Sequence, residues 1–125
     1  MQRPPFNLFE GPDPPQPCEN ELSETIWSGR NSRIERIVST GQASAPGFWY
    51  DQEEDEWVSV LQGHAELEFE DGQRLKMERG DCFAIPAHCR HRVAHTSSEP
   101  ACIWLAVWSR SDDAAPRGDD PLDPE

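Results

Sequence analysis

The sequence predicts a small all-β domain, a sandwich or a barrel, and three observations lead to this fold class. The chain has 125 residues, which leaves room for one domain. Its middle section alternates short β-rich segments with turn residues, and no stretch keeps a helical period. Such regular spacing is typical of small sandwiches and barrels.

Eight segments have the composition of strands, and turn residues separate each from the next. Gly63 stands between two of them, and Asp71-Gly72 predicts a tight hairpin turn. In chain order the predicted strands are 24–28, 33–40, 56–62, 64–70, 73–77, 81–86, 90–96 and 101–108.

Side-chain periodicity indicates which strand faces are buried. Ala65, Leu67 and Phe69 alternate with polar residues, so they predict one buried face on the strand that carries them. Segment 103–108 is apolar on both faces, as expected for a strand that is covered on both sides.

Composition changes near both ends of the chain and divides it into three parts. Residues 1–22 form a proline-rich arm, residues 23–108 the β-barrel domain, and residues 109–125 an acidic tail that we expect to be disordered. The segment Phe6–Phe9 carries three large apolar side chains, which we expect to dock on the domain or on a partner subunit.

The chain is strongly acidic, with 24 Asp and Glu against 11 Lys and Arg and a formal net charge of −13. This balance argues against nucleic acids and anionic membranes as partners. No apolar run is long enough to span a membrane, and the start lacks an apolar signal core, so we expect a cytoplasmic protein. The four cysteines show no close pairs, which predicts reduced, structural thiols.

Glu56 is the first candidate site residue. It follows the acidic run 51–55, and on the predicted strand it shares a face with Val58 and Val60. Its carboxylate therefore points toward an apolar interior, where it needs a cation, a metal or several hydrogen-bond donors. We interpret the acids at 53–55 as a solvated loop.

Three of the four histidines, His88, His91 and His95, fall within eight residues. Period-2 alternation places His91 and His95 on one face of the strand 90–96. Beside an apolar strand these side chains predict a polar pocket, and the simpler alternative is that each is an ordinary surface or core histidine.

The two segments together resemble the motifs of the cupin superfamily, in particular its small single-domain members. The first cupin motif ends with Glu, six residues and Gly, which Glu56 and Gly63 match. The second places Gly, Pro and His at a spacing that Gly80, Pro86 and His91 match. The resemblance begins at the second predicted strand and implies a double-stranded β-helix, or jelly-roll, barrel.

The first motif departs from the family pattern, in which two histidines precede the glutamate and help it to bind a divalent metal. Depending on the register, the corresponding positions are Trp49 and Asp51 or Tyr50 and Gln52. No histidine is available in either register, so the family's usual metal site is incomplete.

The second motif carries two extra histidines, since His88 replaces a glycine and His95 an asparagine. The Cα atoms of His91 and His95 are expected about 13 Å apart on a strand, so we do not expect them to share a metal. We expect His88 and His95 to line the pocket together with Trp49 and Gln52.

The resemblance implies a metal site of Asp51, Glu56 and His91, in which Gln52 is the alternative to Asp51. Such an oxygen-rich set favours one divalent Mn, Fe or Zn ion. The alternative is a metal-free pocket in which Glu56 and His91 bond to each other. As catalytic residues we name Glu56 as base or ligand, His91 as ligand or acid, and Tyr50 as a proton donor.

Two functions from different classes stay open at this point. The first is a divalent-metal-dependent enzyme that acts on a small organic substrate as an isomerase, lyase or oxygenase. The second is a non-catalytic module that binds a small molecule or a metal. In either case we expect a homodimer, and the absence of a Gly-rich phosphate loop predicts no nucleotide cofactor.

Overall fold

The computed structural model describes residues 5–10 and 21–110. Residues 111–125 of the predicted tail, and most of the predicted arm, lie outside the described residues. The strands, all antiparallel, are β1 Leu22–Ser28, β2 Ser32–Ser39, β3 Asp55–Gln62, β4 His64–Phe69, β5 Arg74–Glu78, β6 Cys82–Ile85, β7 His91–Thr96 and β8 Cys102–Ser109.

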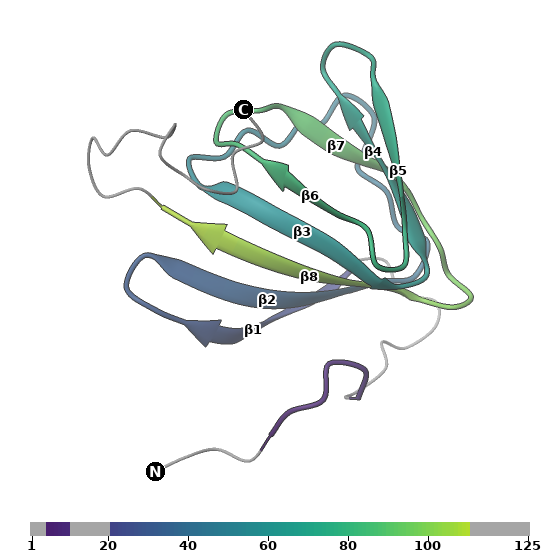
Figure 1. Ribbon diagram of the computed structural model, residues 1–125. Helices are drawn as coiled ribbons and strands as arrows, with labels where there is room; N and C mark the ends of the chain where they lie inside the picture. Colours follow the sequence, from purple (N-terminus) through teal and green to yellow (C-terminus); the bar gives the residue numbers. More distant parts are fainter. Residues whose placement is uncertain (1–4, 11–20, 111–125) are drawn as a thin grey trace.

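The strands form two sheets, which appear as two layers in Figure 1. The five-stranded sheet has the order β1-β2-β8-β3-β6, and the three-stranded sheet has the order β5-β4-β7. Apolar side chains from both sheets fill the space between them, including Val60, Leu67, Met77 and Trp104. This architecture confirms the predicted all-β jelly-roll barrel.

The predicted strands are confirmed, each within two residues at either end. The Asp71-Gly72 turn is confirmed as well, because Gly72 has a φ of 93° and its N–H donates to the carbonyl of Phe69 at 2.9 Å. Between β3 and β4, Gly63 has a φ of 79°, and a Cβ there would collide with the Oγ of Ser97.

One strand differs from the simple alternation that its sequence predicts. In the pairing of β4 with β7, Leu67 lies opposite Val93, and the residue before it, Glu66, lies opposite His95. The strand β7 therefore carries an extra residue, a β-bulge, which turns His95 to the face opposite to His91. The prediction that His91 and His95 share a face is corrected by this bulge.

The arm segment 5–10 docks on the outer face of the five-stranded sheet, on Arg36 of β2. Three of its carbonyl groups accept hydrogen bonds from Arg36 Nη1, at 2.6 to 3.4 Å. The guanidinium also lies 5.0 Å from the ring centroid of Phe6. Phe6 and Phe9 nevertheless remain 54% and 60% exposed, so docking depends on backbone carbonyls rather than on apolar burial.

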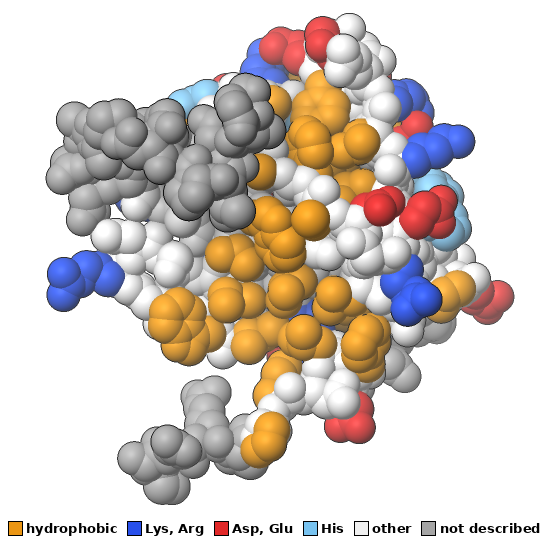
Figure 2. Space-filling view, in the orientation of Figure 1, with side chains coloured by type: hydrophobic (Ala, Val, Ile, Leu, Met, Phe, Trp, Pro, Cys, Tyr) orange, Lys and Arg blue, Asp and Glu red, His pale blue; other side chains and the backbone are white. Residues whose placement is uncertain are grey.

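The same outer face is mostly apolar. Figure 2, which has the orientation of Figure 1, shows a continuous band of hydrophobic side chains across it. We call this band the outer apolar face; strand pairing places on it Leu22, Trp27, Ile34, Val38, Trp57, Leu105 and Val107.

Cys82, Cys89 and Cys102 are free thiols, and Cys18 lies outside the described residues. Burial raises the pKa of Cys102 to about 12, which suits an inert core residue. Among residues 5–10 and 21–110 there is no helix that could cross a membrane.

Candidate functional site

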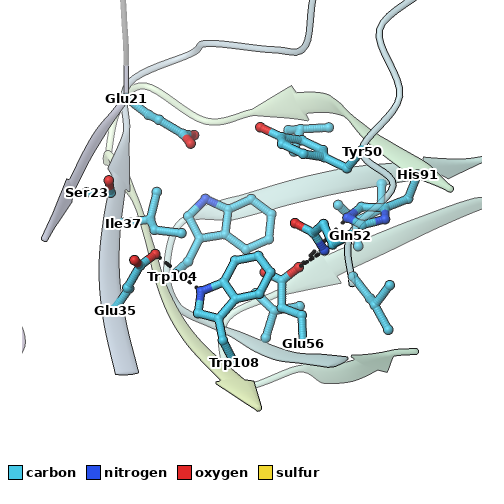
Figure 3. A pocket seen from close by; sticks show the side chains of 14 residues that line it. Glu21, Ser23, Glu35, Ile37, Tyr50, Gln52, Glu56, His91, Trp104 and Trp108 are labelled. Atoms are coloured by element: carbon cyan, nitrogen blue, oxygen red, sulfur yellow. Dashed lines mark hydrogen bonds and ion pairs between the residues drawn. The ribbon is translucent and has the colours of Figure 1, made fainter. Parts of the chain in front are cut away.

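A cavity of about 140 Å³ lies between the two sheets (Figure 3). This volume is close to that of an engineered cavity, about 150 Å³, that holds benzene. Its lining consists of Glu21, Ser23, Glu35, Ile37, Tyr50, Gln52, Glu56, Val58, Leu67, Ile85, His91, Val93, Trp104 and Trp108.

The strand order sets how the polar and aromatic groups of the cavity are arranged. Trp104 and Trp108 lie on the central strand β8, between Glu35 on β2 and Glu56 on β3. Glu56 lies directly opposite Trp108 in the sheet, and Ile37 lies opposite Trp104. Alternation along three neighbouring strands therefore directs all these side chains to the inner face.

Glu56 is buried without full compensation of its carboxyl group. The residue is 8% exposed, and its Oε1 accepts one long hydrogen bond, 3.5 Å from Gln52 Nε2. Its second oxygen has no hydrogen-bond partner within the described ranges. Burial raises the pKa of Glu56 from 4.5 to about 7; the bond from Gln52 opposes this rise, and Glu35 and Glu21 add to it.

His91 faces Glu56 across the end of the cavity, with His91 Nε2 3.8 Å from Glu56 Oε1. The other ring nitrogen, Nδ1, lies 2.9 Å from the carbonyl of Cys89. A carbonyl only accepts, so Nδ1 carries the proton, and Nε2 of the neutral ring presents its lone pair to the cavity. Burial lowers the pKa of His91, against the opposing effect of the Cys89 bond, so the neutral form prevails at pH 7.

Tyr50 holds the third polar position beside the pair. It is joined to His91 by two backbone hydrogen bonds, of 2.7 and 3.2 Å, and the two rings stack with centroids 5.4 Å apart. Burial, followed by the charges of Glu21 and Glu56, raises the pKa of the Tyr50 phenol. The hydroxyl therefore keeps its proton at neutral pH.

Half of the predicted site residues line the cavity and half do not. Glu56, His91, Tyr50 and Gln52 are among the lining residues, as Figure 3 shows. The other four predicted residues, Asp51, Trp49, His88 and His95, are not.

Asp51 and His88 pair with each other instead, outside the cavity. The Oδ1 of Asp51 lies 2.8 Å from His88 Nδ1, and both side chains are about half exposed or more. The turn that carries His88 has a φ of 64° at this residue. His95, beyond the bulge in β7, stacks on His64 with ring centroids 5.3 Å apart.

Among the lining residues that sequence reasoning missed are two acids and two tryptophans, Glu21, Glu35, Trp104 and Trp108. Glu35 had a usable signal, because it alternates with Ile37, which faces the interior. The two tryptophans lie in a segment that is apolar on both faces, so periodicity could not assign their side. Glu21 precedes the first strand, where no periodic pattern extends.

The donor set falls short of the metal site that the fold family implies. Across the described residues, no three His, Cys, Asp or Glu side chains gather closely enough to hold a metal ion. Glu56 and His91 are two candidate donors, and Asp51 turns to His88. Structural and catalytic sites for zinc use three or four protein ligands, so the residues present do not fit a resident ion of that kind.

Comparisons with known proteins agree with this architecture. The family model for the cupin domain matches residues 36–108. A solved structure from Ralstonia eutropha JMP134, named as a candidate mannose-6-phosphate isomerase, is 43% identical; the match covers 87% of this chain and 100% of that one, with a TM-score of 0.79. A cupin superfamily protein from Desulfitobacterium hafniense DCB-2 is 18% identical over 89% of this chain and 94% of its own, with a TM-score of 0.67. No curated protein matches the chain.

Proposed function

This chain belongs to the cupin domain family, and we propose that it is an enzyme that moves a proton on a small organic carbonyl compound. The observation that carries the proposal is the pair of Glu56 and His91, 3.8 Å apart at the end of a cavity. One group is a poorly compensated carboxyl, and the other is an imidazole with a free lone pair. A carboxyl whose pKa is about 7, beside a neutral imidazole, is suited to proton transfer.

The roles of the two groups follow from their protonation, and they reverse the base and acid roles that the sequence predicts for Glu56 and His91. The Nε2 of His91 accepts a proton from the carbon beside the carbonyl, while protonated Glu56 donates its proton to the carbonyl oxygen. With an α-hydroxy carbonyl substrate the product is an enediol. Protonated His91 then gives its proton to the former carbonyl carbon while the Glu56 carboxylate takes the proton of the neighbouring hydroxyl, which gives the isomer. The phenol of Tyr50 donates a hydrogen bond to a substrate oxygen. The name of the Ralstonia protein, an isomerase, supports the same reaction class.

A solvent-exchange experiment tests this proposal. D-Mannose and D-glyceraldehyde are incubated with the protein in D₂O, and exchange at C2 is followed by proton NMR. We expect exchange with the wild type and with Asp51→Asn, whose carboxylate lies outside the cavity, and at least about a hundredfold less with Glu56→Gln. Equal exchange rates in wild type and Glu56→Gln would contradict the assigned roles.

The second candidate function is a non-catalytic module that binds a small molecule. The small number of metal ligands favours this binding function. Among the described residues no three possible ligands gather, and a catalytic zinc site uses at least three. Binding of a probe without any exchange at its carbon acids would select this function over catalysis.

Elemental analysis tests the predicted divalent Mn, Fe or Zn ion. The full chain is purified without chelator and compared with Glu56→Gln and His91→Ala. One equivalent of metal in the wild type, lost in both variants, would restore the metal-dependent mechanism. On the donor set present, we expect well under one equivalent in all three proteins.

We also propose that the chain forms a homodimer through the outer apolar face. In a chain of net charge −13, this face is largely uncharged outside the docked arm, because its Arg36 pairs with Glu24, so a second copy meets it without like-charge repulsion. Trp27, 55% exposed at its edge, lies on this face, and Phe48, 46% exposed, lies in the segment before β3. Analytical ultracentrifugation should show weaker association for Trp27→Ser than for Phe48→Ser; an unaltered dimer in Trp27→Ser would argue against this face.

A further inference from the structure

The cavity has a one-sided charge pattern. Three acidic side chains line it, those of Glu21, Glu35 and Glu56, and no described lining residue is Lys or Arg. The guanidinium of Arg33, beside the lining residue Glu35, donates to Glu54 at 2.8 Å and to Glu35 at 3.2 Å. Because Arg33 is held by these two acids, it cannot turn to a ligand without breaking both pairs.

The aromatic walls add to this pattern. The Nε1 of Trp104 donates to Ser39 Oγ, and the Nε1 of Trp108 donates to Glu35 Oε1, each at 3.2 Å. With both N–H groups engaged, the indoles offer a ligand their ring faces, which carry the negative part of the quadrupole. Trp108 already takes a cation in this way, because the guanidinium of Arg33 lies 4.9 Å from its ring centroid.

Glu56 supplies the observation that points to a missing ligand. Its side chain is 10% exposed and lines the cavity, and its nearest polar contacts are a 3.5 Å hydrogen bond from Gln52 and the Nε2 of His91 at 3.8 Å. A carboxylate removed from water in this way is costly unless a cation or donors compensate it. A positively charged ligand beside Glu56 provides that compensation.

We propose that the cavity binds a small organic ammonium ion, held by the three carboxylates and the faces of Trp104 and Trp108. The volume of about 140 Å³ admits a compact headgroup of roughly six heavy atoms, and the exposed Ser23 lies where the rest of a ligand can leave. This inference rests on the proposed function only in taking the cavity as the substrate site.

The acidic lining of the cavity also disfavours a phosphorylated substrate. A sugar phosphate would bring a doubly negative group to three carboxylates with no free cation to receive it. We therefore infer that a ligand with an ammonium group fits this cavity better than a sugar phosphate does, in contrast to the phosphate in the name of the Ralstonia protein.

Calorimetric titration with matched probes tests the charge. Choline and 3,3-dimethylbutan-1-ol have nearly the same shape, and only choline is charged; mannose 6-phosphate serves as the anion. We expect choline to bind at least about tenfold more tightly than the neutral alcohol, and the phosphate not at all. Equal binding of choline and the alcohol, tighter binding of the phosphate, or no binding of choline at millimolar concentration each overturns the proposal.

Variants then locate the binding. Glu21→Gln and Glu35→Gln keep the side-chain size and should each weaken choline binding several-fold, whereas Glu78→Gln, on the exposed surface of β5, should not. Unchanged affinity in both cavity variants would mean that choline binds elsewhere, and would overturn the assignment. Glu56-dependent C2 exchange on the neutral aldoses tests the proposed function separately, so the two can fail independently.

Discussion

Two ionisable side chains are buried on opposite faces of the same five-stranded sheet, and they differ in the number of their hydrogen-bond partners. Arg36, 4% exposed on the outer face, donates to Glu24 and to three backbone carbonyls of the arm. Glu56, 8% exposed on the inner face, accepts a single 3.5 Å hydrogen bond. A buried charge with all its partners holds structure together, and one without them stores free energy that a ligand can release.

The largest effect that this comparison predicts is for Arg36. Removing it by Arg36→Met should lower the free energy of unfolding by about 4 kcal/mol, because Glu24 and the arm carbonyls lose their common donor. Urea denaturation measures the change. The control, Arg74→Met, removes a half-exposed arginine that pairs with Glu66 and Glu68, and should cost less than about 1 kcal/mol. Equal losses in the two variants would break the comparison.

The second effect concerns Glu56, whose replacement is expected to raise the free energy of unfolding rather than lower it. Since the pKa of Glu56 rises from 4.5 in the unfolded chain to about 7 in the fold, the folded state holds a proton that the unfolded state lacks between these values. This makes stability fall as the pH rises from about 4.5 to 7, by at most about 3 kcal/mol.

The variant Glu56→Gln removes this titration. It should therefore be more stable than the wild type by about 2 kcal/mol at pH 8, and equally stable near pH 4.5. His91 titrates in the opposite sense, because its lowered pKa costs stability as the pH falls below 6.5, but it does so in both proteins. Urea denaturation across this pH range gives the difference, and a variant that is less stable at pH 8 would refute the interpretation.

Two buried serines on opposite faces of the five-stranded sheet show whether a missing hydrogen-bond partner, rather than the inner face as such, distinguishes Glu56. Ser39 is fully buried on the inner face and contacts Trp104 and Glu21, while Ser59 on the outer face donates to the carbonyl of Asp81. Both are satisfied, so Ser39→Ala and Ser59→Ala should each cost about 1 kcal/mol. If Ser39→Ala instead stabilised the fold, the cost of burying Glu56 would come from its position on the inner face and not from its lack of hydrogen-bond partners.

The smallest effect is expected at the exposed pair of Asp51 and His88. Asp51→Asn should change the free energy of unfolding by less than about 0.5 kcal/mol, because water screens and replaces this contact. Metal content and choline affinity should also stay at their wild-type values. A metal found in the wild type and lost in Asp51→Asn would instead return Asp51 to the ligand set that the sequence predicts.

The fold was predictable because its signals are local. Turn residues such as Asp71-Gly72 and the alternation of Ala65 and Leu67 fix strand ends and faces without knowledge of the partner strands. For the same reason, the inward direction of Glu56 and His91 could be foreseen from their strands.

The rest of the site depends on features that a single strand does not reveal. One extra residue in β7 reverses His95, and a bulge depends on the pairing with β4. Glu35 joins the cavity because its strand β2 lies beside β8, and Glu21 joins it because β1, which it precedes, pairs with the other edge of β2. Asp51 was assigned by motif spacing, and the turn at His88 gives it a different partner.

The measurement that tests the central claim most directly is the pKa of Glu56 itself. Carboxyl carbon-13 NMR follows each glutamate through a pH titration, and Glu56→Gln identifies the resonance that belongs to Glu56. We predict a midpoint near 7, which a saturating concentration of choline shifts to lower pH. A midpoint at or below 4.5 in the free protein would show that Glu56 already has full compensation, and would contradict its assignment as the carboxyl that awaits a ligand.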